Sequence, residues 1–244
     1  MKATVYLPRD AAALALGADA VAVAMANEAA ARGIALRILR NGSRGMVWLE
    51  PLVEVVTAQG RVAYGPVTVD VVAGLFDAGF LSGAAHPLCL GPTEAIPWLA
   101  RQTRRVTQRL GVVDPRSLAD YIARGGGEAL RRARAMAPAA IVQAVTDSGL
   151  RGRGGAAFPA GIKWRTVHDA AAGQKYVVCN ADEGDSGTFA DRMLMEGDPF
   201  CLLEGMAIAG RAVGADRGYI YVRSEYPHAI AALQAAIAAA GDFL

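Results

Sequence analysis

Glycine, basic and aromatic residues are concentrated in one stretch of the sequence, between Gly149 and Trp164. Glycines let the backbone approach a ligand closely and adopt positive φ angles, so that consecutive N–H groups can form an anion-binding nest. The glycines expected to do this are Gly152, Gly154 and Gly155. The basic and the flat apolar side chains beside them are Arg151, Arg153, Lys163, Phe158 and Trp164. This composition predicts a site for a ligand that combines a phosphate with a planar ring.

Two common phosphate-binding motifs do not account for this stretch. Gly152, Gly154 and Ala157 fit the spacing G-x-G-x-x-G/A, but that motif follows a strand in dinucleotide-binding folds, and a helix is expected here. A Walker loop fails as well, because no Gly directly precedes Lys163 and no Ser or Thr follows it. A glycine-rich surface loop without a ligand is the alternative to a phosphate site.

A second polar stretch, 180–192, directly follows an apolar run, 175–180, whose β-branched residues predict a strand. Ligands of open α/β sheets bind beyond the carboxyl ends of the strands. Asn180 and Asp182 can therefore hydrogen-bond the polar edge of a flavin, and Glu183 can meet a sugar or a carboxamide. An acidic surface loop without a ligand is the alternative for this stretch.

A third stretch, 218–226, is expected to begin as a strand and to end in polar residues, among them Arg223 and Glu225. Taken alone, it is better explained as an ordinary core strand. A helix is expected between the two strands, over 199–213, and the order strand, helix, strand implies parallel pairing with a right-handed crossover. The sequence therefore predicts parallel strands in this part of the chain.

The N-terminal region has the order of elements of a small α/β domain. Strands are expected at 3–7 and 34–39, a hairpin at 53–57 and 61–64, and helices at 17–32, 67–78 and 93–110. The segment 111–127, with its Asp-Pro and its glycine triplet, is the expected junction. We therefore expect a first domain over 1–112, a linker with a helix over 113–136, and a second domain over 137–244.

Composition and charge argue against several classes of function. The formal net charge of +2 is too small to indicate nucleic-acid binding. No apolar run is long enough for a membrane span, and the sparse cysteines, Cys89, Cys179 and Cys201, fit a cytoplasmic protein better than a disulfide framework. Because these cysteines cannot supply the four thiolates of an iron–sulfur cluster, no metal site is expected.

The glycine-rich stretch and the Asn-Ala-Asp-Glu stretch together resemble the NADH-oxidising flavoprotein subunit of respiratory complex I and its relatives. These relatives include the diaphorase subunits of NAD-reducing hydrogenases and of NAD-dependent molybdenum formate dehydrogenases. The resemblance runs from about Ala137 to the C-terminus, and it implies one cavity in which NADH stacks on FMN. The residues that it implies for FMN are Gly152, Arg153, Gly154, Gly155, Lys163, Asn180 and Asp182. Those that it implies for the shared pocket of NADH and FMN are Phe158, Glu183, Tyr221 and Glu225.

The N-terminal region resembles the thioredoxin-like domain that is fused to this flavoprotein or partners it. In the partner form that domain carries a two-iron cluster on four cysteines, and because this region has only Cys89, the cluster is expected to be absent. The stretches Gly42–Pro51 and His86–Glu94 are most similar to the beta subunit of the soluble formate dehydrogenase. The implied fold is α/β, with a thioredoxin-like domain followed by a partial Rossmann-like FMN-binding domain with parallel strands.

The resemblance also implies a reaction and a set of partners. Hydride passes between nicotinamide C4 and flavin N5, and no acid–base side chain is required. Electrons then pass between FMN and iron–sulfur clusters, with formate oxidised at molybdenum in another subunit or with a hydrogenase as the partner. Family members continue through a ubiquitin-like domain to a helical bundle that binds a cluster, so the chain is expected to be truncated at Leu244, inside the FMN domain.

Two hypotheses that assign the chain a different kind of function are alternatives to this one. The chain could serve as a non-catalytic assembly or docking fragment, with its N-terminal domain acting only as a binding surface. An ordinary nicotinamide dehydrogenase is the other alternative, and the helix expected before the glycine-rich stretch disfavours it.

Overall fold

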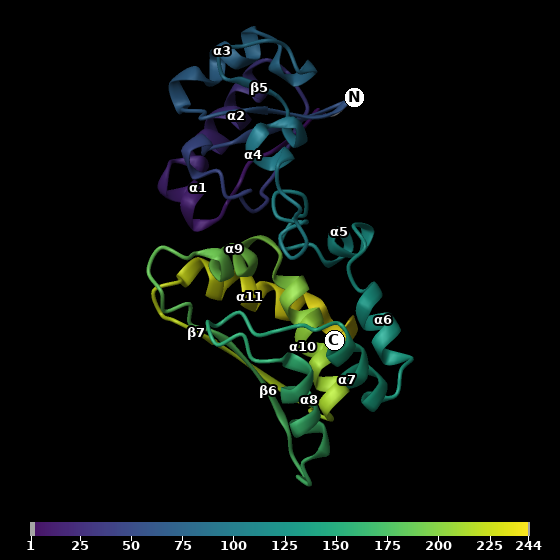
Figure 1. Ribbon diagram of the computed structural model, residues 1–244. Helices are drawn as coiled ribbons and strands as arrows, with labels where there is room; N and C mark the ends of the chain where they lie inside the picture. Colours follow the sequence, from purple (N-terminus) through teal and green to yellow (C-terminus); the bar gives the residue numbers. More distant parts are fainter. Residues whose placement is uncertain (1–2, 244) are drawn as a thin grey trace. The chain divides into compact units, whose positions relative to one another are not determined.

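The computed structural model of the chain describes residues 3–243 and divides it into two compact units (Figure 1). The first unit comprises Met1–Pro115 with Glu196–Asp198, and the second comprises Arg116–Met195 with Pro199–Leu244. Met1, Lys2 and Leu244, the outermost residues of the two predicted domains, lie outside the described residues. Each unit is described by itself below.

The first unit is built on a five-stranded mixed sheet with the order β2-β1-β3-β4-β5. Its strands are β1 (Ala3–Tyr6), β2 (Leu36–Leu39), β3 (Val53–Thr57), β4 (Gly60–Tyr64) and β5 (Cys89–Pro92). The pair β1 and β2 is parallel, and the remaining neighbours are antiparallel. The strands predicted near 3–7, 34–39, 53–57 and 61–64 are thus confirmed, whereas β5 was not predicted.

Aliphatic and aromatic side chains form the core of the first unit. Helix α2 (Ala18–Ala31) connects the parallel strands, and α3 (Val72–Asp77) packs beside it. The short helices of this unit are α1 (Ala11–Ala15), α4 (Pro97–Ala100) and the 3-10 turns η1 (Val47–Leu49), η2 (Val69–Val71), η3 (Phe80–Ser82) and η4 (Thr93–Ala95). The main core cluster includes Val5, Leu7, Val21, Met25, Val53, Val55, Tyr64, Leu75 and Phe80.

The long helix predicted over 93–110 is wrong. Only Thr93–Ala95 and Pro97–Ala100 are helical there, and residues 101–113 are irregular, with turns over 106–112. The physical reason is that 101–109 carries Val106 as its one aliphatic side chain, and that side chain is 61% exposed. A helix in this segment would have no apolar face to bury.

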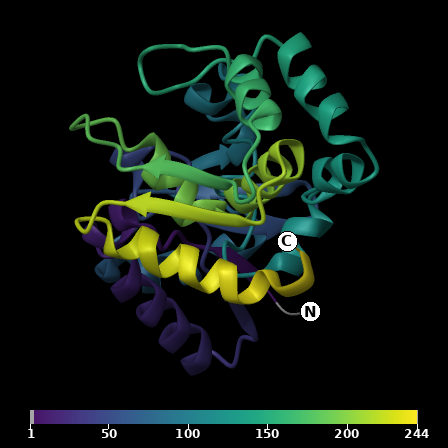
Figure 2. The same cartoon turned by 90° about the horizontal axis from the view of Figure 1, so that it is seen from below.

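The second unit combines a two-stranded parallel sheet with helices (Figure 2). Its helices are α5 (Leu118–Ala123), α6 (Glu128–Arg134), α7 (Pro138–Asp147), α8 (Ala160–Asp169), α9 (Ala190–Gly197), α10 (Pro199–Val213) and α11 (Pro227–Ala240), followed by the 3-10 turn η5 (Gly241–Phe243). The strands β6 (Tyr176–Ala181) and β7 (Arg217–Val222) pair in parallel across the crossover through α9 and α10. The predicted α/β fold with parallel strands and a helix before the glycine-rich stretch is confirmed.

The segment predicted as a linker, 113–136, is largely part of the second unit. The division between the units lies after Pro115, and Glu204 of α10 anchors the residues that follow. Its buried carboxylate accepts hydrogen bonds from the Tyr121 hydroxyl and from the backbone N–H groups of Gly127 and Leu130. These bonds hold α5 and the start of α6 against α10.

None of the helices between residues 3 and 243 combines the length and the apolar character needed to span a bilayer.

A buried carboxyl group in the first unit has an unusual protonation behaviour. Glu50 Oε2 accepts the backbone N–H of Leu52 at 2.8 Å, and Oε1 has no hydrogen-bond partner within the described part of the chain. Burial raises the pKa of Glu50 to about 8. The native state therefore holds a proton that the unfolded chain releases above about pH 4.5, and stability declines as the pH rises from there to about 8.

We expect Glu50→Gln to remove this pH dependence, because the amide stays neutral and its oxygen can still accept the Leu52 N–H. At pH 8 the variant should exceed the native chain in unfolding free energy by on the order of 2–4 kcal/mol, and at pH 5 the two should be similar. Thermal or denaturant unfolding at both pH values measures this. Glu128→Gln is the control, since Glu128 is exposed and its pKa is lowered by Arg131. If the unfolding free energies of the native chain and of Glu50→Gln changed with pH in the same way, Glu50 would not have the raised pKa.

Candidate functional site

The glycine-rich stretch forms a loop whose two ends are tied together. The N–H of Gly152 donates to the carbonyl of Phe158 at 2.8 Å, and the N–H of Ala160 donates to the carbonyl of Leu150 at 2.8 Å. Between these bonds Gly155 has φ 96° and Ala157 has φ 51°, and every residue from 151 to 158 is exposed. We call residues 151–158 the glycine loop. Its tip presents backbone to solvent, as a phosphate cradle requires.

The three basic side chains near the glycine loop differ in whether they already bond to the protein. Arg151 donates from Nη1 to the carbonyl of Ala157 at 3.0 Å, so it holds the loop closed. Arg153 and Lys163 are exposed, and neither side chain has a hydrogen bond or ion pair within residues 3–243. These two side chains are therefore the cations that remain available to an anion.

Helix α8 follows the glycine loop and is fixed by a close crossing with α7. A Cβ atom on Gly161 would lie 2.5 Å from the Cα atom of Thr146, so only glycine allows the two helices to approach this closely. Trp164 on α8 packs against the cluster around Val142, Ala212 and Val213. Trp164 is only partly buried, so the fold uses part of the flat surface that was expected to face a ligand, and its contact with a ligand stays a prediction. Phe158 remains 48% exposed.

The outer face of the two-stranded sheet carries the predicted polar and aromatic residues. Asn180 lies opposite Tyr221 in the parallel register, and both are exposed. The Oδ1 atom of Asn180 accepts the N–H of Asp182 at 3.3 Å, while its amide nitrogen has no partner among the described residues. The Tyr221 side chain is 64% exposed. An amide donor and an aromatic ring thus lie side by side near the carboxyl ends of β6 and β7.

Glu183 and Glu225, the two predicted glutamates, lie in contrasting surroundings. The Glu183 carboxylate accepts the N–H groups of Asp191 at 2.7 Å and Arg192 at 3.0 Å, and the Tyr226 hydroxyl at 3.2 Å. The Glu225 side chain is 67% exposed. A hydrogen bond from its own N–H, followed by one from the Ser224 hydroxyl, lowers the pKa of Glu225. Glu225 is therefore ionised and accessible, whereas the Glu183 carboxylate is already occupied.

Aromatic and guanidinium groups surround Glu183, and sequence reasoning assigned them no role. The Arg192 guanidinium lies 4.3 Å from the ring centroid of Phe189, and Arg223 lies 5.5 Å from that of Tyr226. Burial, and then the negative charge of Glu183, raise the pKa of Asp191. The signal available in the sequence was that Arg223 directly follows the second strand and that Phe189 and Arg192 lie in the polar stretch 180–192 after the first.

The predicted residues fall into two groups in the second unit. The glycine loop and the loops that follow β6 and β7 extend toward the same side of the unit (Figure 2). Asn180, Asp182, Glu183, Tyr221 and Glu225 are brought together at the ends of the paired strands. Within residues 3–243 no hydrogen bond joins this group to the glycine loop. That one ligand bridges the two groups therefore stays a prediction.

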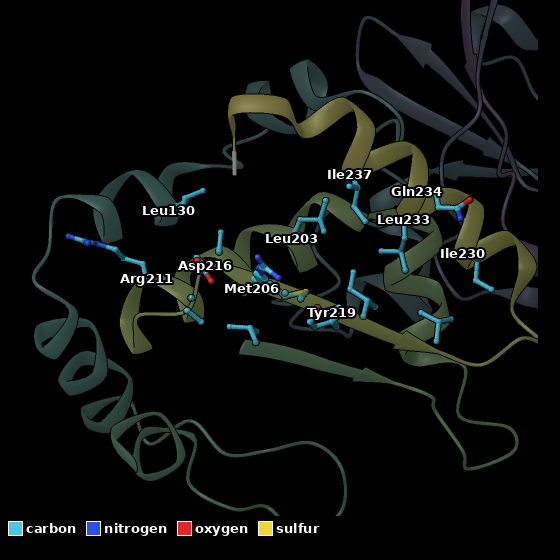
Figure 3. A pocket seen from close by; sticks show the side chains of 18 of the residues that line it. Leu130, Leu203, Met206, Arg211, Asp216, Tyr219, Ile230, Leu233, Gln234 and Ile237 are labelled. Atoms are coloured by element: carbon cyan, nitrogen blue, oxygen red, sulfur yellow. The ribbon is translucent and has the colours of Figure 1, made fainter. Parts of the chain in front are cut away.

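A cavity of about 870 Å³ lies elsewhere in the second unit, along β7 and between α10 and α11 (Figure 3). Its lining is mainly apolar and includes Leu203, Met206, Ile220, Leu233 and Ile237. None of the predicted site residues lines it. Nor do the described residues contain a group of three or more His, Cys, Asp or Glu side chains arranged to hold a metal ion.

Comparison with known proteins identifies the second unit. Residues 145–243 match the model of the Nuo51 FMN-binding domain. The NADP-reducing hydrogenase subunit HndC of Solidesulfovibrio fructosivorans is 52% identical over 143 residues, which are 59% of this chain and 29% of that protein. The F subunit of the NADH-quinone oxidoreductase of Escherichia coli is 45% identical over 127 residues, 51% of this chain and 28% of that protein.

Two further matches extend over more of the chain. The NAD-reducing hydrogenase HoxS subunit alpha of Cupriavidus necator is 37% identical over 166 residues, 68% of this chain and 26% of that protein. A crystal structure of an air-oxidized NAD+-reducing nickel–iron hydrogenase aligns with a TM-score of 0.46 and 27% identity, over 98% of this chain and 41% of that one.

The matched segments span 26% to 29% of the length of these curated relatives. The matched residues include the whole glycine loop, both strands and the loops that follow them. On these findings the resemblance is confirmed for the matched part of the chain, residues 145–243, which belong with the FMN-binding domains of NADH-oxidising flavoprotein subunits.

Proposed function

We propose that this chain binds FMN and NADH and forms part of a diaphorase subunit. The observation that carries the proposal is the glycine loop, an exposed turn of backbone beside two cations without a protein partner, inside the segment that matches an FMN-binding domain. The loop is open to the approach of the FMN phosphate, because a Cβ atom on Gly154 would meet no atom within 4 Å. When bound, FMN supplies the hydride chemistry and the exchange of single electrons.

The chain's own residues would bind and orient the ligands. The amides of the glycine loop, with Arg153 and Lys163, would hold the phosphate. Asn180 and Asp182 would hydrogen-bond the polar edge of the flavin ring. Phe158 and Tyr221, whose rings are largely exposed, would provide apolar contact to NADH. Orientation of the two rings by such contacts accounts for much of the rate, and no side chain needs to transfer a proton.

The proposal also includes the identity of the complex that exchanges electrons with FMN. We infer an NAD-dependent molybdenum formate dehydrogenase of the cytoplasm, in which iron–sulfur and molybdenum subunits exchange electrons with FMN. The stretches Gly42–Pro51 and His86–Glu94 of the first unit, which we propose to be thioredoxin-like, support this choice. A hydrogenase or complex I is the alternative, and the names of the relatives favour these two systems.

A docking fragment without activity is the second candidate function. It is favoured by an exposed aromatic pair in the first unit, Trp48 and Trp98, whose rings meet edge to face at 5.4 Å and are 58% and 54% exposed. The two candidates differ in whether the 244 residues retain FMN through gel filtration. Retention supports the flavoprotein, and loss of all FMN at micromolar protein favours the docking fragment.

Gly154→Val tests the phosphate cradle. Because the site is open and φ is not positive there, the valine should fit the ligand-free fold while its side chain blocks the approach of a phosphate. We expect FMN affinity to fall about tenfold or more, measured by quenching of flavin fluorescence. Gly173→Val is the matched control, since that glycine also has open space around it.

Lys163→Ala tests the charge at the same cradle. Loss of one charge-assisted contact should weaken FMN binding about tenfold, and the loss should shrink as the salt concentration rises. Lys163→Arg should retain most of the affinity. Unchanged flavin binding in both Gly154→Val and Lys163→Ala would falsify the assignment of the glycine loop.

Gly161→Ala tests the crossing of α7 and α8 that positions Lys163. The added methyl group collides with the backbone of Thr146, so the helices must separate. We expect the unfolding free energy to fall by about 1–3 kcal/mol and FMN affinity to fall with it. Gly205→Ala in α10, where a Cβ meets nothing within 4 Å, should be neutral or stabilising by up to about 1 kcal/mol. Equal stability of the two variants would show that the crossing tolerates a side chain.

A further inference from the structure

We propose that Glu183 is a positioning residue, whose carboxylate closes the neck of the loop 184–189 and thereby holds the flavin-facing ends of β6 and β7 in place. This inference rests on the proposed function, and it changes the role that the sequence suggested for Glu183. A ligand contact requires free oxygens on the carboxylate. The structure instead shows both oxygens engaged by the protein itself.

The first contact spans the loop. Glu183 stands at its start, and its Oε1 and Oε2 atoms accept the backbone N–H groups of Asp191 and Arg192, which follow its end. All residues from 184 to 189 are exposed, so the loop has no burial of its own to fix it. One side chain therefore joins the two ends of an otherwise exposed loop.

The second effect is helix capping. Helix α9 begins at Ala190, and its first N–H groups have no partner inside the helix. The residue before it, Phe189, has no side-chain oxygen that could accept them. The Glu183 carboxylate takes this place, and its negative charge is favourable at the N-terminal end of a helix. Loss of the carboxylate should therefore free the loop and loosen the first turn of α9 together.

The third contact reaches the segment after β7. The Tyr226 hydroxyl donates to Glu183 Oε2 at 3.2 Å, and Arg223 donates to the backbone carbonyl of Glu183 at 3.3 Å. Tyr226 directly precedes α11, and Arg223 directly follows β7. Glu183 thus links the residues that follow β6 to those that follow β7, between Asn180 on one strand and Glu225 beyond the other.

Backbone strain supports the same role. Glu183 has φ 49° and Phe189 has φ 53°, a left-handed conformation that residues with a side chain seldom adopt. Such residues cost free energy and persist where surrounding contacts impose them. These two stand at the start and the end of the loop, and the contacts of Glu183 and the stacking of Arg192 on Phe189 are what impose them.

The test combines amide hydrogen exchange with flavin binding in the full chain. Glu183→Ala removes all three side-chain contacts, Glu183→Gln keeps one oxygen acceptor, and Tyr226→Phe removes only the hydroxyl. In the ligand-free chain the amides of Asp191 and Arg192 should exchange about tenfold faster in Glu183→Ala, with smaller increases in the other two. FMN dissociation constants should rise in the same order, by about tenfold in Glu183→Ala.

Each result separates the possibilities. Glu128→Gln, an exposed carboxylate in α6, is the matched control and should change neither readout. Unchanged exchange in Glu183→Ala overturns the closing role, and faster exchange with native FMN affinity overturns the positioning role. Weaker binding with unchanged exchange instead makes Glu183 a direct ligand contact. If the native chain binds no FMN, the proposed function is wrong. The amide exchange rates of the variants still decide in that case whether Glu183 closes the loop. If Glu183→Ala does not fold, Glu183→Gln and Tyr226→Phe are compared instead. Faster amide exchange together with weaker FMN binding in these two supports the positioning role, and native values in both overturn it.

Discussion

The parallel pairing of β6 and β7 is the constraint on which the strand-end half of the candidate site depends. Its register sets Asn180 opposite Tyr221 and brings the polar residues after both strands to one place. The pairing itself depends on burial of the inner face, where Cys179, Ile220 and Val222 pack on the cluster around Ala181 and Leu233. A two-stranded parallel sheet is weak alone, so the helices beneath it are what make the site possible.

The glycine loop has a separate support. It is held by α7 and α8, which cross at Gly161 and Thr146, and by its own backbone bonds at the neck. The ends of the loop are therefore fixed, while glycines at its tip adopt backbone angles that other residues avoid, such as φ 96° at Gly155. A loop of this kind can adapt to a phosphate without losing its place on the fold, since only its tip has to move.

Local patterns in the sequence predicted the elements that bury a regular apolar face, among them β6, β7 and α10. They failed over 93–110, where 101–109 carries only the exposed Val106 as an aliphatic side chain and so has no apolar face to bury. They also did not reveal contacts distant along the chain, such as those of Trp164, which looked available but packs partly buried on the cluster around Val142 and Ala212. The anchoring of 116–136 by Glu204 is of the same kind, because no local pattern reveals which buried carboxylate will meet which amides.

What distinguishes binding groups from structural ones in this site is whether the fold already uses their hydrogen-bonding capacity. Arg151 and Glu183 already bond to backbone groups, whereas the Arg153 and Lys163 side chains have no partner among the described residues. Glu225 lies 3.8 Å from Arg223 and accepts the Ser224 hydroxyl, but its side chain remains 67% exposed. Positive charge therefore remains at the glycine loop, and negative charge remains at the strand ends. A ligand with a phosphate at one end and a polar ring edge at the other can contact both groups, and FMN has this arrangement, since its ring edge offers one N–H donor to a carboxylate and carbonyl acceptors to the Asn180 amide. The charge left over by folding, more than the residue types alone, is thus the physical reason to orient the phosphate toward the glycine loop.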